Sequence, residues 1–299
     1  MLGLLLIGLL AETGAGPARP CPAPVAAHLA AEAAIPFELN DGRRILLSGT
    51  LNGAAVMLLL DSGAEASVVD AGVARRLALP AEGTEVARGA VTSSEVTRHP
   101  GALLGIGAAT LAGVTLYAAD LAPLSAAAGK PVDLILGTEL FQSFAVDLDF
   151  AEQLLRLTPA ATFVAPAGMP SVPLVPTADG IRAVPLGIEG RTTILATFDT
   201  GSTAPVALRP EAWRRLGLDR DRPSRPTPAA GVGGTQDARV VRLREVAVGP
   251  IVMHDVPAML LPDRPDGTRD AADANVGLPL FTRARVIVDF CGERLFLRP

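Results

Sequence analysis

Short apolar runs separated by turn residues recur along most of the chain. From Phe37 onward they follow one another about every ten residues, punctuated by Gly, Pro and Asn-Gly pairs. Strands of roughly four to eight residues bounded by turn signals give this pattern, whereas amphipathic helices need longer stretches with a period of about 3.6 residues. The pattern therefore predicts an all-β fold with a few short helices between strands.

The same order of signals occurs twice. Each half has a tight-turn pair, Asn52-Gly53 or Glu189-Gly190, then an apolar run of strand type, and then Asp-Ser-Gly at Asp61 or Asp-Thr-Gly at Asp199. Asn-Gly is a strong hairpin signal, and Glu-Gly is a weaker one. The two halves of the chain therefore begin with equivalent hairpins.

The correspondence continues after the tripeptides. A short helix is predicted over residues 71–77, capped by Asp70, and another begins at Pro210 and stops before Gly217. Further on, Ile135-Leu136-Gly137 matches Asn275-Val276-Gly277. Equivalent residues lie from 138 positions apart (Asp61 to Asp199) to 140 apart (Gly137 to Gly277), which indicates one duplicated unit of domain size.

Asp61 and Asp199 each follow an apolar strand directly. A carboxylate is costly to place there without a partner, and the small hydroxyl residue and glycine that follow suit a sharp turn exposing it. Two carboxylates brought face to face by pseudo-twofold symmetry can share one proton. The pair is therefore a candidate catalytic dyad for general acid–base chemistry.

On these motifs the chain resembles the retropepsin-like and pepsin-like aspartic proteases, most of all bacterial members with two fused retropepsin-like lobes. The resemblance covers about Phe37 to Pro299. It implies an all-β, two-lobed acid-protease fold, with pseudo-twofold duplicated β-barrel lobes and short helices. It also implies an aspartic endopeptidase with Asp61 and Asp199 as catalytic residues, and a Gly137 segment that passes beneath the catalytic turn of its own lobe. Asn275, where an apolar residue is usual, departs from the pattern.

Five neighbours are expected to support the dyad: Ser62, Gly63, Thr200, Gly201 and Ser202. By resemblance, the hydroxyls of Ser62 and Thr200 bond across the lobe interface and hold the two turns in register. Ser202 follows the second tripeptide where Ala64 follows the first, and a hydroxyl there can donate to the carboxylate and favour its charged form. We therefore expect Asp199 to be the more readily ionised member.

Each lobe is also expected to carry a flap hairpin that binds substrate. The candidates are Gly89, Ala90 and Val91 in the first lobe and Gly231, Val232, Gly233 and Gly234 in the second. Glycines would let the backbone approach a peptide closely, although an ordinary glycine turn would look the same. The pepsin-type flap tyrosine has no counterpart, because Tyr117, the only tyrosine, lies well past this region. That absence favours the retropepsin-like side.

The N-terminal region predicts export. Residues 1–15 contain an apolar run of nine residues, too short for a membrane span of about 20 and suited to a signal peptide, although no positive residues precede it. Residues 16–36 are interpreted as a linker and N-terminal arm, with an Ala-rich helical possibility over 25–34. The first lobe is predicted over residues 37–165 and the second over residues 166–299. The expected location is periplasmic or secreted, with no stable membrane span in the mature chain.

Composition and charge exclude several other functions. A net charge of −5 and the absence of a basic stripe argue against nucleic acid. His28, His99 and His254 lack metal-ligand spacing, so no metal or cofactor is expected. Cys21 and Cys291 could pair in an oxidising compartment or remain apart. Because both aspartates lie in one chain, a monomer acting on a peptide or protein substrate is expected. The alternative is a non-catalytic peptide-binding pseudoprotease of the cell envelope.

Overall fold

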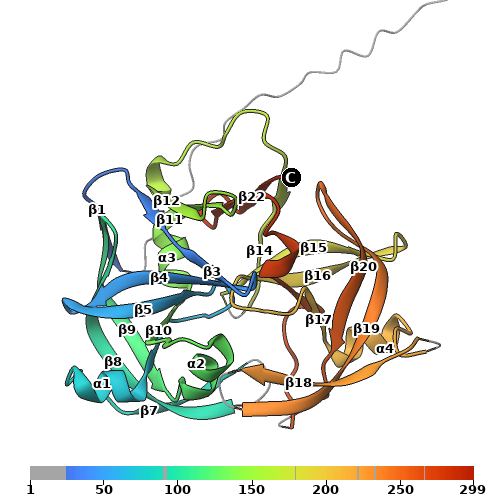
Figure 1. Ribbon diagram of the computed structural model, residues 1–299, viewed down its shortest axis with the longest axis horizontal. Coiled ribbons are helices and arrows are strands. Elements are labelled where there is room, and N and C mark those ends of the chain that lie inside the picture. The colour runs from blue at the N-terminus through green and yellow to red at the C-terminus, as the bar shows by residue number, and fades with distance from the viewer. Residues whose placement is uncertain (1–24, 90–92, 179, 221, 232–233, 266) are drawn as a thin grey trace, which may run out of the picture.

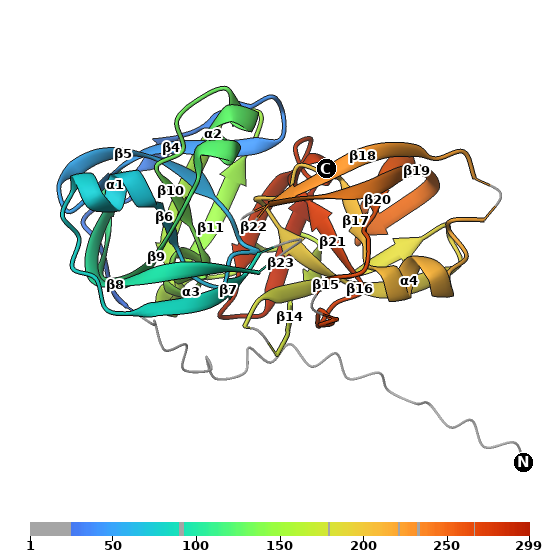
Figure 2. The same ribbon diagram turned by 90° about the horizontal axis from the view of Figure 1, so that it is seen from below.

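The computed structural model describes residues 25–299 except 90–92, 179, 221, 232–233 and 266 (Figure 1). Most of this chain is β-strand, arranged as two lobes side by side with a sheet shared between them (Figures 1 and 2). The predicted all-β, two-lobed fold with duplicated lobes and short helices is confirmed.

The first half contains twelve strands within the described residues: β1 (Ala26–Leu29), β2 (Ala34–Pro36), β3 (Glu38–Asn40), β4 (Arg44–Leu51), β5 (Ala54–Leu60), β6 (Val68–Asp70), β7 (Thr84–Arg88), β8 (Ser93–Ile106), β9 (Ala109–Ala119), β10 (Leu134–Leu136), β11 (Phe144–Asp149) and β12 (Leu154–Pro159). The helical segments of this half are α1 (Ala71–Arg76), α2 (Ala122–Ala128), α3 (Thr138–Ser143) and the 3-10 turn η1 (Ala160–Thr162). All of them are short.

The second half repeats this order. Its strands are β13 (Ser171–Pro173), β14 (Val175–Pro176), β15 (Arg182–Ile188), β16 (Thr192–Asp199), β17 (Val206–Leu208), β18 (Arg225–Gly231), β19 (Gly234–Val248), β20 (Ile251–Leu260), β21 (Ala274–Gly277), β22 (Arg285–Asp289) and β23 (Arg294–Arg298). Its helical segments are α4 (Pro210–Arg215) and the 3-10 turn η2 (Leu278–Leu280).

The sheets of the two lobes have matching strand orders. In the first lobe the order is β1-β9-β6-β10-β5-β4-β8-β7, with β3 paired to β4. In the second lobe it is β14-β15-β16-β21-β17-β20-β19-β18. In both, the strand that ends at the aspartate pairs in parallel with the strand that ends at the apolar-Gly segment, β5 with β10 and β16 with β21. The duplication seen in the sequence is therefore a duplication of topology.

The third sheet joins the lobes. Its order, β13-β23-β22-β11-β12-β2, places three strands from each half in one sheet, and the central pair is β11 with β22. Arg285 on β22 donates from Nε to Asp147 Oδ1 on β11 at 2.9 Å, so an ion pair also crosses the join. The rings of Phe141 from the first half and Phe290 from the second also stack, with centroids 5.2 Å apart. Strand pairing and apolar packing thus fix one lobe against the other.

The predicted hairpins and helices form where expected. Asn52 and Gly53 join β4 to β5 with φ of 50° and 84°, a left-handed conformation that these residue types tolerate. Asp70 caps α1 by accepting from the N–H groups of Gly72 and Val73. In the second lobe α4 begins at Pro210 as expected. Local sequence therefore sets the boundaries of the elements that precede and follow each candidate aspartate.

The Ala-rich helix expected over residues 25–34 is wrong. Residues 26–29 form β1, which pairs antiparallel with β9, and residues 34–36 form β2, which pairs with β12. Alanine favours a helix intrinsically, but here the open edges of β9 and β12 satisfy the backbone hydrogen bonds of this segment instead. The described part of the N-terminal arm is therefore built into the sheets.

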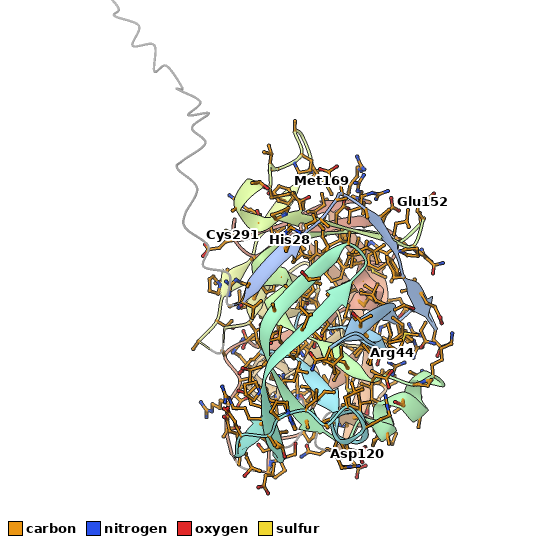
Figure 3. All side chains as sticks on the ribbon, turned by 90° about the vertical axis from the view of Figure 1, so that its left-hand side faces the viewer. His28, Arg44, Asp120, Glu152, Met169 and Cys291 are labelled. Atoms are coloured by element: carbon orange, nitrogen blue, oxygen red, sulfur yellow. The ribbon has the colours of Figure 1, made fainter. Side chains whose placement is uncertain are left out.

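Two further expectations about the termini stay predictions: the signal peptide at residues 1–15, which lies outside the described residues, and the pairing of the two cysteines. Cys21 lies outside the described residues, and Cys291 is half-buried at the outer edge of the molecule (Figure 3), so their pairing is not tested. In the part of the chain that the structure describes, no helix is long and apolar enough to cross a membrane.

Candidate active site

The two Asp-Ser/Thr-Gly turns meet where the lobes join. The backbone of Asp61 continues from β5 and donates its N–H to the carbonyl of Leu136 at 3.0 Å. In the second lobe Asp199 is the last residue of β16 and lies opposite Gly277 of β21. Each aspartate is thus placed by the parallel pairing of two buried strands, and the sequence-predicted pair is brought together.

Reciprocal hydrogen bonds lock the two turns to each other. The Ser62 hydroxyl donates to the Phe198 carbonyl at 2.8 Å and accepts from the Thr200 N–H at 3.0 Å. The Thr200 hydroxyl donates to the Leu60 carbonyl at 3.1 Å and accepts from the Ser62 N–H at 2.9 Å. Both side chains are buried. The cross-lobe bonding that the resemblance implied is therefore present, and each hydroxyl both donates and accepts.

The glycines of the tripeptides are required by close approach. A Cβ on Gly63 would lie 2.7 Å from the carboxyl carbon of Asp199, and a Cβ on Gly201 would lie closer still to that of Asp61. Real Cβ atoms do not approach other heavy atoms so closely, so any other residue would push the opposite carboxyl away. Gly63 and Gly201 thus allow each carboxyl group to lie against the backbone of the other turn.

The apolar-Gly segments pass beneath the turns. The Thr138 N–H donates to the Ala64 carbonyl at 3.0 Å, and a Cβ on Gly137 would lie 2.7 Å from the backbone carbon of Ala66. In the second lobe the Leu278 N–H donates to the Ser202 carbonyl at 3.2 Å. The expectation for the Gly137 segment therefore matches the structure, and the second lobe is built alike.

A buried carboxyl group below the first turn was missed by the sequence reasoning. Glu139 accepts from the N–H and hydroxyl of Ser67, both at 2.9 Å, and the Ser67 hydroxyl accepts from the Gly137 N–H at 3.0 Å. Burial raises the pKa of Glu139. Proline stands at the equivalent positions of the second lobe, Pro205 and Pro279, so the repeat gave no signal for this arrangement.

The two aspartates differ in their protonation. Burial is the largest cause that raises the pKa of Asp61, followed by the negative charge of Asp199, and the result lies well above the usual value. Burial also raises the pKa of Asp199, but its hydrogen bonds with Asp61, Ser202, Gly201 and Asn275 all act in the opposite direction. Two carboxyl groups so close cannot both ionise cheaply, so one proton is shared between them. The N–H donors that Ser202, Gly201 and Asn275 direct at Asp199 favour its charged form.

The expected cause of this difference was wrong in its detail. The Ser202 hydroxyl donates to the Ala204 carbonyl at 3.4 Å, while the Ser202 backbone N–H donates to Asp199 Oδ1 at 2.9 Å. The residue supports the carboxylate, but through its main chain, because the turn directs that N–H inward. A backbone N–H is available from any residue except proline, so the hydroxyl is not what distinguishes the second lobe.

Asn275 and Arg209 are site residues that the sequence reasoning did not identify. The Asn275 amide nitrogen donates to Asp199 Oδ2 at 2.9 Å, and Arg209 Nη2 donates to the Asn275 amide oxygen at 3.3 Å. The break in the apolar pattern at Asn275 is visible in the sequence, but the pattern by itself assigns the residue no role. Its contact with Arg209 comes from residues 66 positions apart and could only be seen in the fold.

A hairpin lies at each of the two positions expected for a flap. Strands β7 and β8 pair in the first lobe, and β18 and β19 pair in the second, with Gly231 opposite Gly234. In both views the two hairpins extend toward the junction of the lobes (Figures 1 and 2). Ala90, Val91, Val232 and Gly233 lie outside the described residues. The carbonyl of Gly89 accepts from Arg264 Nη1 at 3.1 Å, so the first hairpin contacts a loop of the second lobe.

Comparison with known proteins agrees with this geometry. A model of the aspartyl protease family matches the chain twice, over residues 47–140 and 184–277, and the two matches together cover more than half of it. The chain belongs to the aspartyl protease family. Each match begins in the strand that precedes an aspartate-bearing strand and ends at, or just after, an apolar-Gly segment. None of the curated proteins compared with this chain matches it.

We expect the Thr200 hydroxyl to contribute more to the free energy of unfolding than the methyl group of the same side chain. Thr200→Ala removes the donor to the Leu60 carbonyl and the acceptor for the Ser62 N–H, leaving both groups buried without that partner. The free energy of unfolding should fall by about 1–3 kcal/mol. Thr200→Ser keeps the hydroxyl and serves as the control. Urea unfolding measures both variants, and equal losses in the two would contradict the role given to the hydroxyl.

The raised pKa of Asp61 predicts a pH-dependent stability. A carboxyl whose pKa is higher in the folded state contributes stability that is fully present below its ordinary pKa of 3.8 and is lost as the pH rises through the folded-state value. Asp61→Asn has no charge to lose, so its Tm should exceed that of the wild type by an amount that grows from pH 4 to pH 7. Calorimetry across this range measures the difference, and a gap that shrinks with rising pH would refute the assignment.

Proposed function

We propose that this protein is an aspartic endopeptidase that hydrolyses peptide bonds with a water molecule activated by Asp61 and Asp199. One observation carries the proposal. Two carboxyl groups, one from each lobe, lie against each other on turns locked by the Ser62 and Thr200 hydroxyls, and each affects the pKa of the other. Membership of the aspartyl protease family supports the same reaction class.

The chemistry follows from one proton shared between two carboxyl groups. The ionised partner takes a proton from water, and the resulting nucleophile attacks the carbonyl carbon of the peptide bond. The protonated partner donates to the carbonyl oxygen and stabilises the tetrahedral intermediate. Proton transfer to the amine then completes the cleavage and returns the dyad to its starting charge. This route requires neither a metal nor a covalent acyl-enzyme.

Substrate binding is assigned to the two hairpins. The β7–β8 hairpin near Gly89 and the β18–β19 hairpin near Gly231 and Gly234 extend from opposite lobes toward the same junction (Figure 1). An extended peptide between them and the dyad could form main-chain hydrogen bonds with both, as peptides do at exposed strand edges. We propose a peptide or protein substrate held in this way, and a monomer as the working unit, because one chain supplies both aspartates.

Replacing either aspartate should abolish turnover while preserving the fold. Asp61→Asn and Asp199→Asn should each lower kcat by at least about a thousandfold, because asparagine cannot exchange a proton with water and members of one catalytic unit act non-additively. The double variant should be barely worse than either single one. Cleavage of a mixed peptide library, followed by mass spectrometry with and without a pepstatin-type inhibitor, measures the effect.

Asp41→Asn is a matched control, because Asp41 is exposed in the turn between β3 and β4. It should cleave like the wild type. Near wild-type proteolysis by either dyad variant would rule out the shared-proton mechanism. Peptide binding without cleavage by the wild type would instead establish the non-catalytic alternative. Activity per mole that fell on dilution would contradict the monomer.

Export is a separate proposal that rests on the apolar run at residues 2–10. We propose that residues 1–15 are a signal peptide and that the mature protein acts in the periplasm or outside the cell. Expressed with its native N-terminus in a Gram-negative host, the protein should appear in the periplasmic fraction or the medium, shortened by about 15 residues. Intact mass measurement tests this, and full-length protein in the cytoplasm alone would contradict it.

A further inference from the structure

The two lobes place different side chains at two equivalent positions beside the dyad. Asn275 on β21 stands two residues before Gly277, as Ile135 on β10 stands two residues before Gly137. Arg209 precedes α4 as Asp70 precedes α1. The Arg209 N–H donates to the Asp273 carbonyl and the Asp70 N–H donates to the Asp133 carbonyl, both at 2.9 Å. The backbones are therefore alike, and only the side chains differ.

Arg209 determines which way the Asn275 amide faces. A guanidinium has donors and no acceptor, so the group that meets Arg209 Nη2 at 3.3 Å must be the amide oxygen of Asn275. The amide nitrogen then faces Asp199 Oδ2 at 2.9 Å. Because an NH₂ group can only donate, this contact favours the carboxylate form of Asp199 over a protonated Oδ2.

Arg209 is itself held in place. Its Nε lies 3.1 Å from Asp270 Oδ2. Arg264 forms an ion pair with the same carboxylate, with Nη2 2.7 Å from Oδ1. The Arg209 side chain is only 12% exposed. A buried guanidinium fixed by an ion pair keeps a well-defined position and loses little entropy on bonding Asn275.

Among the residues that the structure describes, the first lobe gives Asp61 no contact equivalent to that of Asn275 with Asp199. Ile135 is buried in a small apolar cluster with Leu46, Leu59 and Leu121 and has no polar atom to donate. Asp70 uses its carboxylate for α1 and for the Leu121 N–H. Asp61 Oδ1 accepts from the Gly63 N–H at 2.9 Å, matching the Gly201 contact of Asp199 at 3.0 Å. The Ser202 N–H also donates to Asp199, at 2.9 Å, and a backbone hydrogen bond from Ala64 likewise lowers the pKa of Asp61, so the Asn275 contact is what distinguishes Asp199 from Asp61.

We infer that Asn275, oriented by Arg209, is a positioning residue that makes Asp199 the ionised member of the dyad and leaves the proton on Asp61. The inference rests on the proposed function and deepens it, since it assigns Asp199 as the base toward water and Asp61 as the acid toward the carbonyl oxygen. The charged groups that act on Asp199 are Asp61 across the lobe junction and Arg209 before α4, with Asp270, Arg264 and Glu211 around Arg209.

Asn275→Ile tests the inference by giving the second lobe the residue of the first. If Asn275 stabilises a charge located on Asp199, its loss raises the first macroscopic pKa of the dyad by about one unit, the usual scale of a hydrogen bond to a charged group. The second pKa rises by less, because the singly and doubly ionised dyads lose the same contact as far as the single charge stays on Asp199. Titration of ¹³C-labelled aspartate carboxyls by NMR measures both steps, with Asp61→Asn and Asp199→Asn for assignment.

Ile135→Val is the matched control, because it alters the equivalent position of the other lobe without removing a hydrogen bond. It should leave both pKa values where they are. Arg209→Gln is the second variant and decides the matter if Asn275→Ile does not fold. It frees the amide to rotate and removes a nearby positive charge, so the first pKa should rise here too. A shift of the second pKa alone, or no shift in either variant, overturns the inference.

The NMR titration also separates this inference from the proposed function, because it reads protonation whether or not peptides are cleaved. A raised first pKa in a protein that cleaves nothing would refute the protease and keep the assignment of charge. Peptide cleavage by the wild type, together with unchanged dyad pKa values in Asn275→Ile, would keep the protease and refute the assignment of charge. Where activity is present, the acidic limb of the kcat/KM profile should move by the same amount as the first pKa, and the basic limb should move less, following the second pKa.

Discussion

The four hydrogen bonds between the Ser62 and Thr200 turns are the constraint on which the site depends. Each hydroxyl donates to a carbonyl of the other lobe and accepts from an N–H of the other turn, so a shift of one lobe would break several bonds of buried groups at once. Buried polar groups that lose their partners are costly, which makes the relative position of the two turns stiff. Two carboxyl groups that repel each other can remain close only because this framework holds them there.

The shared six-stranded sheet supports that framework from below. Strands β11 and β22 pair across the lobe boundary, and the Arg285–Asp147 ion pair and the Phe141–Phe290 stack also join the two halves. Since α3 and η2 follow the apolar-Gly segments directly, a few residues of chain connect the sheet to the segments that pass beneath both turns. The lobes are therefore joined both at the dyad and at the sheet, and the hairpins at β7 and β18 are left as the elements that extend toward the junction.

Duplication gives a symmetric scaffold, but the chemistry needs an asymmetric pair. The backbone geometry around Asp61 and Asp199 is nearly repeated, with equivalent glycines, hydroxyls and N–H donors. Symmetry alone would leave the proton equally shared. The exchange of Ile135 for Asn275 and of Asp70 for Arg209 breaks the symmetry at two side chains while leaving the strand pairings intact. A small polar change on a rigid frame is sufficient to bias a proton between two close carboxyl groups.

The sequence by itself determined the strands, the hairpin turns, the duplication and the two aspartates. These depend on local rules: apolar runs form buried strands, Asn-Gly and Glu-Gly adopt left-handed turns, and residues at one offset occupy equivalent places. The tripeptide hydroxyls could be placed as well, but only through the family resemblance, because their partners lie 136 to 140 residues away.

The tertiary structure decided the features that depend on strand pairing and on contacts between distant side chains. The alanines at 26–29 became a strand because β9 offered an open edge, against their intrinsic preference for a helix. The Ser202 hydroxyl turned away from Asp199, since the turn already supplies its N–H. Asn275 was only a break in the apolar pattern until the fold placed Arg209 on one side of its amide and Asp199 on the other. A hydrogen bond needs two partners and a direction, and a sequence specifies those only after the chain has brought distant residues together.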